Sequence, residues 1–267
     1  MEKLLKSKKI IKMKKRNINK LLILFVLFGV MFYSCKKENT KIGVLKTYFP
    51  KDKEILFSAY FIKKGDTILD GKYILCKYNG VKIKSGIFKN GEAIGPVIFY
   101  FENGNIESID YKNEKRLSEE TTYYYESGKI KRYALSDDSE KTAFIAKFDT
   151  IGDINSWQGF PVMEVYQYKK SSKQKNDQHL KVGDVFIHKY IVANIPNTKR
   201  TFKIENLSSD NSKINRKMLK TSRTNIDVKE VLTQKGINTI RAIVKYEFND
   251  KEKTIINDTI SFSVNVN

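Results

Sequence analysis

The chain has few of the residues from which catalytic and metal sites are most often built. Its 267 residues include only two His, two Cys and one Trp. His179 and His188 are nine residues apart, a spacing that matches no common metal-ligand pattern. The sequence also lacks the Gly-x-Ser-x-Gly, Gly-Lys-Ser/Thr and His-Glu-x-x-His motifs of hydrolases, nucleotide-binding loops and zinc proteases. We therefore expect no enzyme activity, no metal and no cofactor.

Adjacent acidic residues do not change this expectation. Glu119-Glu120 and Asp137-Asp138 lie in strand-like or turn-like sequence. Neighbouring residues of a strand point to opposite faces, so each pair is expected to diverge or to face water. That geometry suits neither general acid–base catalysis nor glycoside cleavage.

Proline is also scarce, with four residues, whereas 40% of the chain is hydrophobic and 12% is aromatic. Such a chain can bury a core and is not disordered overall. The aromatic residues are mostly Tyr and Phe, which favour strands. The length suggests two domains after removal of an amino-terminal signal.

The formal net charge of +20 is unevenly distributed along the chain. Residues 1–34 hold nine Lys or Arg and one acidic residue, which leaves 41 basic and 29 acidic residues in the remainder. The later lysines alternate with other residues, as at Lys82, Lys84 and Lys89, whereas nucleic-acid-binding proteins usually show a basic stripe or an Arg-rich cluster. We expect solvated strand faces and no nucleic-acid partner.

The amino terminus has the three parts of a secretion signal in order. Residues 13–20 are basic, residues 21–33 form an apolar run of 13 residues, and Ser34-Cys35 follows. A membrane-spanning helix needs about 20 apolar residues, so a cleaved signal is favoured over a permanent span. The signal is complete without the first twelve residues, so either Met1 or Met13 can be the start.

Phe32-Tyr33-Ser34-Cys35 resembles a relaxed lipobox, with Phe32 where an aliphatic residue is usual. The resemblance implies that residues 1–34 are a lipoprotein signal peptide and that Cys35 carries the lipid, which makes the membrane a partner. The alternative is an ordinary Cys at the end of a different signal or of an anchor helix. Cys76 is the only other Cys, so no intrachain disulfide is expected, and a small buried hydrophobe is the favoured interpretation.

The residues after Cys35 suggest a location. Lys36 stands where Asp favours inner-membrane retention in enteric bacteria, and Lys36-Lys37-Glu38 resembles the surface-export tethers of other lipoproteins. We expect a lipid-anchored protein of the cell envelope, in the outer membrane, with either a periplasmic or a surface-exposed position.

A repeat of 24 residues runs through the first half, marked by Gly80, Gly104, Gly128 and Gly152. Aromatic residues precede each glycine, and an Ile follows the last three at the second position. A second phase appears at Gly71 and Gly95.

Asn-Gly pairs at 79–80, 90–91 and 103–104 accept positive φ at both positions and predict tight hairpins. The residues between the turns, such as 97–101 and 121–125, are rich in β-branched and aromatic types. Each unit is therefore predicted to be a pair of strands in a meandering antiparallel sheet.

This pattern of Asn-Gly, paired aromatics, Glu-Asn-Gly and Ile resembles the MORN-variant repeats of bacteria, the group that includes YwqK-type proteins labelled as antitoxin components. The best matches are 88–91 through 99–104 and 123–128. Glu114 and Glu119 depart from the pattern at positions where glycine is expected. The resemblance implies a MORN-like repeat sheet whose surface partners use, and an antitoxin-like or immunity function is one alternative that follows from it.

The second half has a different pattern. Strands are predicted at 162–168, 185–193, 201–205, 238–248 and 259–266, and the last two alternate strictly between apolar and polar residues. Polar stretches at 169–178 and 208–225 predict long loops, with a short helical turn near 215–220. The strand order suggests an Ig-like β-sandwich, which residues 235–240 also resemble.

The sequence thus predicts an all-β chain with four parts: signal peptide 1–34, tether and first strands 35–60, MORN-variant repeat domain 61–159, and Ig-like β-sandwich domain 160–267. The predicted function is that of a non-enzymatic binding or scaffold module with a protein or glycan partner. A carbohydrate-binding or adhesion lipoprotein is the first alternative, and exposed Tyr100, Tyr124 and Tyr125 would support it.

Overall fold

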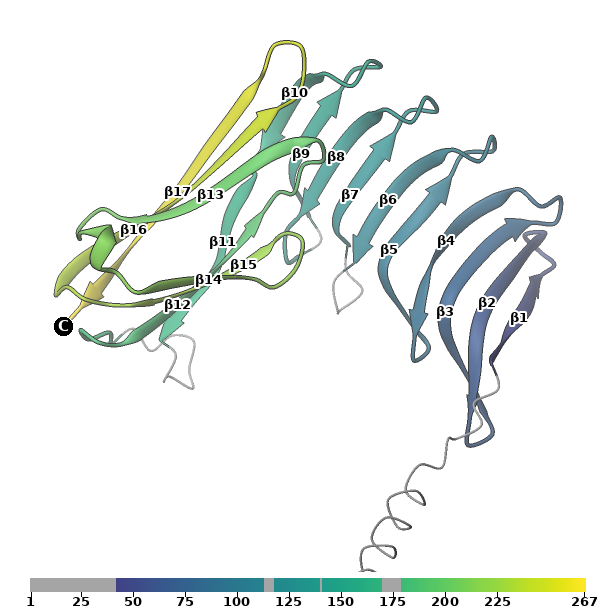
Figure 1. Ribbon diagram of the computed structural model, residues 1–267, viewed down its shortest axis with the longest axis horizontal. Helices are drawn as coiled ribbons and strands as arrows, with labels where there is room; N and C mark the ends of the chain where they lie inside the picture. Colours follow the sequence, from purple (N-terminus) through teal and green to yellow (C-terminus); the bar gives the residue numbers. More distant parts are fainter. Residues whose placement is uncertain (1–41, 113–117, 140, 170–178) are drawn as a thin grey trace, which may run out of the picture. The chain divides into compact units, whose positions relative to one another are not determined.

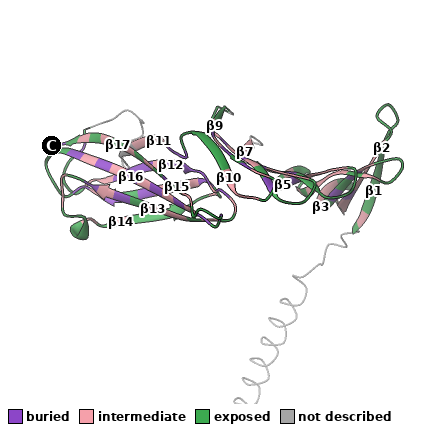
Figure 2. Ribbon diagram, turned by 90° about the horizontal axis from the view of Figure 1, so that it is seen from above, coloured by how far each residue is buried: buried purple, intermediate pink, exposed green. Residues whose placement is uncertain are grey.

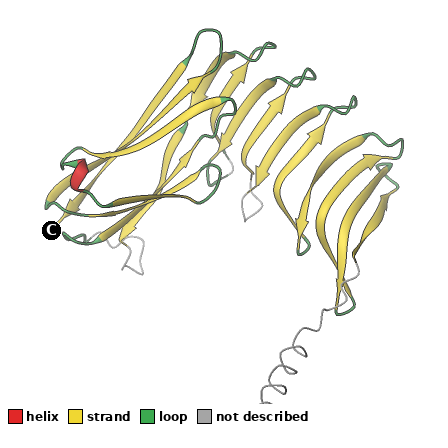
Figure 3. Cartoon of the chain, in the orientation of Figure 1, coloured by secondary structure: helices red, strands yellow, loops and turns green. Residues whose placement is uncertain are grey.

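The computed structural model describes residues 42–112, 118–139, 141–169 and 179–267. Signal, Cys35 and tether lie outside these residues. The described chain is all-β, as predicted, with antiparallel sheets and one short 3-10 turn at Asn211–Lys213 (Figure 3).

The first ten strands form one sheet in which every strand lies beside the next along the chain (Figure 1). Their bounds are β1 Ile42–Phe49, β2 Glu54–Lys63, β3 Asp66–Lys77, β4 Lys82–Lys89, β5 Glu92–Tyr100, β6 Ile106–Lys112, β7 Ser118–Tyr124, β8 Ile130–Ser136, β9 Thr142–Phe148 and β10 Ile154–Gly159. The predicted meander is therefore observed, whereas its MORN-like identity stays a prediction.

The four repeat glycines occupy equivalent turns. Gly80, Gly104, Gly128 and Gly152 all have positive φ, between 82° and 97°. In each turn the glycine N–H donates to the carbonyl three residues earlier, as from Gly104 to Phe101 at 2.9 Å. These contacts describe a three-residue loop in which glycine alone has the left-handed conformation.

One detail of the predicted turns is wrong. Only Asn90-Gly91 has positive φ at both positions, whereas Asn79 and Asn103 do not. The side chains of these two asparagines instead accept hydrogen bonds from the backbone N–H two residues later, at 3.1 and 2.9 Å. At these two positions Asn stabilises the turn through its side chain, as an Asx turn, and does not adopt the left-handed backbone conformation.

The repeat is also visible in the pairing of the strands. Register shifts follow Leu75, Phe99 and Tyr123, which are separated by the same interval as the glycines. Each shift places one extra residue in a strand and bends it. The repeated sequence thus produces a repeated bend. The predicted turn that contains Glu114 lies outside the described residues.

The second half contains two further sheets. The strands are β11 Val162–Lys169, β12 Val185–Val192, β13 Thr198–Asn206, β14 Arg216–Lys220, β15 Asn225–Val231, β16 Gly236–Phe248 and β17 Ile255–Val266. One sheet has the order β11-β12-β15-β14 and the other β13-β16-β17. Buried residues, purple in Figure 2, follow β12, β15 and β16.

The five predicted strands are present, and β16 and β17 alternate in burial as predicted. The predicted loop 208–225 and its helical turn at 215–220 are wrong in part, because that turn is strand β14. Its residues are mostly exposed and basic, as expected of an edge strand. Strand β15 was not predicted. Its buried positions are Ile226, Val228 and Glu230, and the charged Glu230 interrupts the apolar alternation that marks a strand.

The two sheets of the second half pack through aromatic side chains. Phe186 on β12 contacts Phe262 on β17, with ring centroids 6.2 Å apart, and Tyr190 contacts Phe202 on β13 at 5.4 Å. Facing sheets of this kind are compatible with a sandwich. The Ig-like topology stays a prediction.

Buried contacts also cross residue 160. The Tyr133 hydroxyl on β8 accepts from the Asn194 N–H at 2.8 Å and donates to Glu120 on β7 at the same distance. Arg223 donates to Glu120 from the β14–β15 connection. One hydrophobic cluster includes residues from both halves. The sheet therefore changes near residue 160 while the core continues, and the independence of the two predicted domains stays a prediction.

The turn geometry predicts a stability difference between neighbouring positions. A Cβ at Gly104 or Gly128 would meet nothing within 4 Å, so any cost of substitution arises from the backbone conformation. Gly128→Val is expected to reduce the free energy of unfolding by more than about 1 kcal/mol, because a β-branched residue is strained at positive φ.

Lys129→Val is the matched control, because Lys129 is exposed in the same turn. Denaturant unfolding of both variants is the measurement. Equal stability of Gly128→Val and the unmodified chain would contradict the role assigned to the glycine.

Candidate functional site

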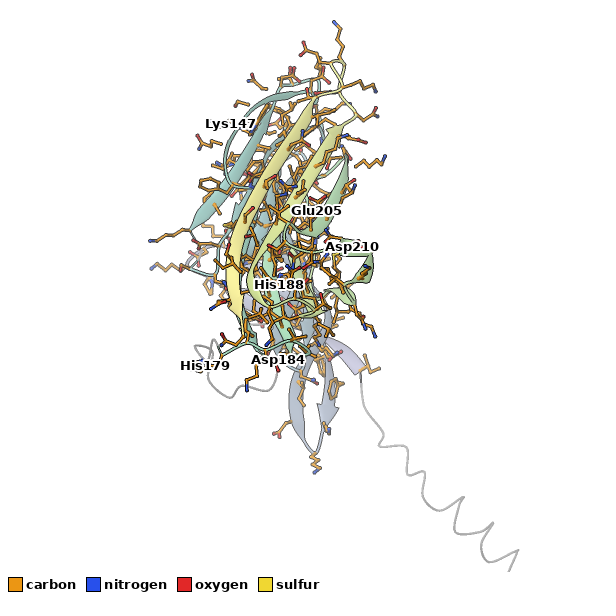
Figure 4. The ribbon with its side chains drawn as sticks, turned by 90° about the vertical axis from the view of Figure 1, so that its left-hand side faces the viewer. Lys147, His179, Asp184, His188, Glu205 and Asp210 are labelled. Carbon is orange, nitrogen blue, oxygen red and sulfur yellow. The ribbon has the colours of Figure 1, made fainter. Side chains whose placement is uncertain are left out.

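Three side chains form a row across the first sheet. Arg132 on β8 lies directly opposite Tyr123 on β7 and, on its other side, opposite Lys147 on β9. Directly opposite residues of antiparallel strands share one face of the sheet. The residues beside them in sequence, such as Tyr133 and Ala146, are buried on the other face. The row therefore lies on the more open face, where Lys147 is exposed (Figure 4).

Aromatic rings support two cations in this region. The Arg132 guanidinium carbon lies 4.0 Å from the centre of the Tyr123 ring, and Lys131 Nζ lies 5.7 Å from the centre of the Tyr125 ring. The Tyr125 hydroxyl donates to the Phe148 carbonyl at 2.9 Å, which fixes its ring. Cations over aromatic faces are attracted by the ring quadrupole, so the two basic groups are held close to the sheet.

Within the described part of the chain, neither Arg132 nor Lys147 forms an ion pair. Two like charges directly opposite each other on neighbouring strands are destabilising. The sheet thus carries an electrostatic cost at this position. An anion that contacts both groups would remove it.

The row lines a groove of about 460 Å³. Phe101, Glu107 and Asn155 also line it. The groove therefore contains one carboxylate against the three cations Lys131, Arg132 and Lys147. Its chemistry is that of a site for an anionic group, with charge-assisted hydrogen-bond donors beside aromatic surface.

The three tyrosines named from the sequence are half-buried rather than fully exposed. Tyr100 lies under Lys82, whose Nζ is 4.4 Å from the ring centre, and its hydroxyl is 2.8 Å from Ser85 Oγ. Tyr124 packs against the shared core. Tyr124 and Tyr125 both line the groove, and Lys131 lies over the Tyr125 ring. These rings are engaged by the protein and do not form a bare stacking ladder.

A second cluster of ionisable groups is buried between the sheets of the second half. His188 Nδ1 lies 2.7 Å from the Tyr190 hydroxyl, and Arg216 Nε donates to Glu230 at 2.6 Å. Burial lowers the pKa of His188, and nearby Glu230 offsets this only in part. Burial opposes ionisation of Glu230, but its contacts with His188 and Arg216 lower its pKa overall.

We assign a neutral His188 and an ionised Arg216–Glu230 pair at neutral pH, because His188 Nε2 is 3.9 Å from Glu230 whereas Arg216 is at hydrogen-bond distance. His188 is labelled in Figure 4. His188 and Glu230 are almost fully buried, and a buried polar cluster of this kind orders a core, while Arg216 lines a pocket of about 400 Å³ with residues of β13 and β14. This cluster is the less favoured candidate for function.

The predicted divergence of Glu119 and Glu120 is wrong, because both carboxylates meet the connection between β14 and β15. Glu120 pairs with Arg223, while Glu119 accepts from Asn225 Nδ2 at 2.9 Å and from Ser222 at 3.2 Å. Burial raises the pKa of Glu119. These residues join the two halves, a role that the sequence could not show because their partners are about 100 positions away.

The remaining predicted site residues are placed as follows. Cys35 lies outside the described residues. The glycines at 80, 104, 128 and 152 form turns at the ends of strands. Cys76 is half-buried with a free thiol.

Across the ranges that the structure describes, no three His, Cys, Asp or Glu side chains come together as a metal site. In the same ranges, no helix has the length and apolar character needed to cross a membrane.

The groove residues were not found from the sequence. Lys131, Arg132 and Lys147 resemble the other single basic residues of exposed strand faces. The usable signal was the pairing of β8 with β9, which a turn at 137–141 implies and which places Arg132 opposite Lys147. Without that register, the sequence does not show that Arg132 and Lys147 are neighbours.

Comparisons with known proteins identify no function. No protein-family model matches the sequence, and no curated protein matches it. Among solved structures, one described as "the crystal structure of the conserved domain protein from Bacillus anthracis" is 9% identical, covers 87% of this chain and 93% of its own, and has a TM-score of 0.21.

Proposed function

We propose that this chain is a lipid-anchored protein of the cell envelope that acts as a non-enzymatic binding module, and that the groove beside Arg132 binds an acidic polysaccharide. The observation that carries the proposal is the pair of unneutralised cations, Arg132 and Lys147, directly opposite each other on the open face of the sheet.

The charge of the groove favours an anionic ligand. Arg132 presents a planar guanidinium that can hold a carboxylate or sulfate group through two hydrogen bonds. Lys147 and Lys131 add two ammonium groups that line the same groove. An acidic ligand relieves the repulsion within the groove, whereas a neutral ligand does not.

The aromatic surface favours a polysaccharide over an acidic peptide. Among the residues that the structure describes, no cation lies over Phe101, which lines the groove and leaves a ring for the apolar face of a sugar. A polysaccharide chain is also stiff, so it loses less conformational freedom on binding than an unfolded peptide does. Neutral sugars are disfavoured because cations occupy the faces of Tyr123 and Tyr125.

The proposed location in the cell envelope is supported by the sequence of the amino terminus. The basic, apolar and Ser34-Cys35 segments support export and lipid attachment, and β1 begins seven residues after Cys35. This short connection would hold the sheet near the membrane surface. The antitoxin-like alternative remains a prediction of the repeat resemblance, and no contact of the groove favours it.

Binding of polygalacturonate, a polymer of acidic sugars, tests the groove. The full chain in detergent is titrated calorimetrically at about 50 mM and about 200 mM salt, where charge-dependent binding should weaken. Arg132→Gln combined with Lys147→Gln is expected to weaken binding by about tenfold or more, since it removes two charge-assisted contacts.

Lys217→Gln combined with Lys220→Gln is the matched control, because it makes the same change in net charge on exposed β14. Unchanged affinity of the groove variant, or an equal loss in the control, would contradict the site. Equal binding of neutral dextran would contradict the acidic ligand, and tighter binding of polyglutamate would identify an acidic peptide instead.

Lipid attachment is tested separately by metabolic labelling with a fatty-acid analogue. The unmodified chain is expected to incorporate the label, and Cys35→Ala is expected to lose it, because the thiol of Cys35 is the attachment point. Cys76→Ala, which removes the other thiol, should label normally. Equal labelling of Cys35→Ala and the unmodified chain would refute the lipid anchor and leave the groove untouched.

A further inference from the structure

Among the residues that the structure describes, no strand pairs with the outer backbone edge of β1 in the ten-stranded sheet. Strand β1 stands first in the strand order, and β2 is its neighbour on the other side. Alternate N–H and C=O groups of such a strand point away from the sheet and can pair with another strand. The side chains of β1 also favour pairing with another strand, because several of them are apolar and exposed.

Large apolar residues are exposed on both faces of β1. Val44 is 65% exposed and Tyr48 is 58% exposed on one face, while Leu45 is 41% exposed on the other, where Phe49 is exposed as well. In a sheet, side chains are buried in part by their neighbours on the adjoining strands. In the described part of the chain, these side chains have such a neighbour on one side only, from β2.

Two edge strands of the other sheets, β14 and β17, are protected in ways that β1 is not. The edge strand β14 carries Arg216, Lys217 and Lys220 within five residues, and β17 presents Ser and Asn between its apolar positions. Strand β1 has a single charged residue, Lys46, and no proline. By the usual criteria for sheet edges, β1 is suited to pairing with another strand.

We propose that β1 pairs in antiparallel orientation with β1 of a second copy of this chain, so that the two sheets become continuous. The symmetry of such a dimer limits the register, because a two-fold axis perpendicular to the sheet pairs residues of the same face. One residue lies on the axis and faces its own copy. The registers with the longest overlap place either Leu45 or Lys46 there.

The register centred on Leu45 is favoured by charge. It places Leu45 opposite Leu45 and Val44 opposite Lys46, which separates the two lysines. The register centred on Lys46 places the two ammonium groups against each other, and like charges directly opposite are destabilising. The predicted interface is therefore apolar at its centre.

The geometry favours a second strand over a membrane surface as the occupant of this edge. The exposed residues lie on both faces of β1, and a flat lipid surface contacts only one side. The unpaired backbone groups also require hydrogen-bonding partners, which hydrocarbon cannot supply. The proposal is independent of lipid at Cys35 and of the groove.

Analytical ultracentrifugation of the full chain in detergent tests the dimer, with Cys35→Ser in every variant so that lipid plays no part. The parent is expected to sediment as a dimer at about 10 µM, an ordinary range for a moderate interface. Leu45→Lys is expected to sediment as a monomer, because it places two charges at the axis.

Leu219→Lys is the matched control, since Leu219 is 57% exposed on edge strand β14. It should remain dimeric. A monomeric parent, a dimeric Leu45→Lys variant or an equal loss in Leu219→Lys would each overturn the proposal. Retention of the chain by lipid vesicles while it remains monomeric would assign the edge to the membrane and overturn it as well.

The register is tested with a short thiol crosslinker in chains that also carry Cys76→Ser. Leu45→Cys is expected to crosslink to its own copy at least several-fold more than Thr47→Cys, because Thr47 faces Gly43 rather than itself. Stronger crosslinking of Thr47→Cys would overturn the register, and absence of crosslinking at both positions would overturn the pairing.

Discussion

Antiparallel pairing between consecutive strands is the constraint on which the first half of this structure depends. Each of the first ten strands lies beside the next, so the turns that the structure describes must reverse the chain within a few residues. The recurring glycines allow this reversal because they adopt positive φ without a Cβ clash. The register shifts after Leu75, Phe99 and Tyr123 then repeat the same bend along the sheet.

A sheet built in this way must place some of its surface against another part of the chain. On β7–β9, residues such as Thr122, Tyr133 and Phe144 are buried, and Tyr133 and Glu120 bind groups from the second half. The opposite face of the same strands carries Tyr123, Arg132 and Lys147. The packing that stabilises one face thus leaves the other available for binding, and the proposed function follows from this division.

Local patterns in the sequence predicted much of the fold. The alternation of β16 and β17 and the interval between the glycines depend on residues close in sequence, so both could be recognised. Strand β15 could not, because buried Glu230 breaks its apolar alternation and is stabilised by Arg216 from a neighbouring strand. The groove could not be predicted either, because its residues also depend on partners from neighbouring strands. Arg132 and Lys147 become neighbours only through the register of β8 and β9, which sequence patterns specify poorly.

The central claim is that Arg132 and Lys147 are kept together for a ligand and at a cost to the sheet. Denaturant unfolding of Lys147→Gln without ligand measures this cost directly, because Lys147 is exposed and is not the cation over the Tyr123 ring. At low salt, the free energy of unfolding should rise by a few tenths of a kcal/mol to about 1 kcal/mol, and the gain should shrink at high salt. A variant that is less stable than the unmodified chain at low salt would show that Lys147 supports the sheet, and the account of the groove would be contradicted.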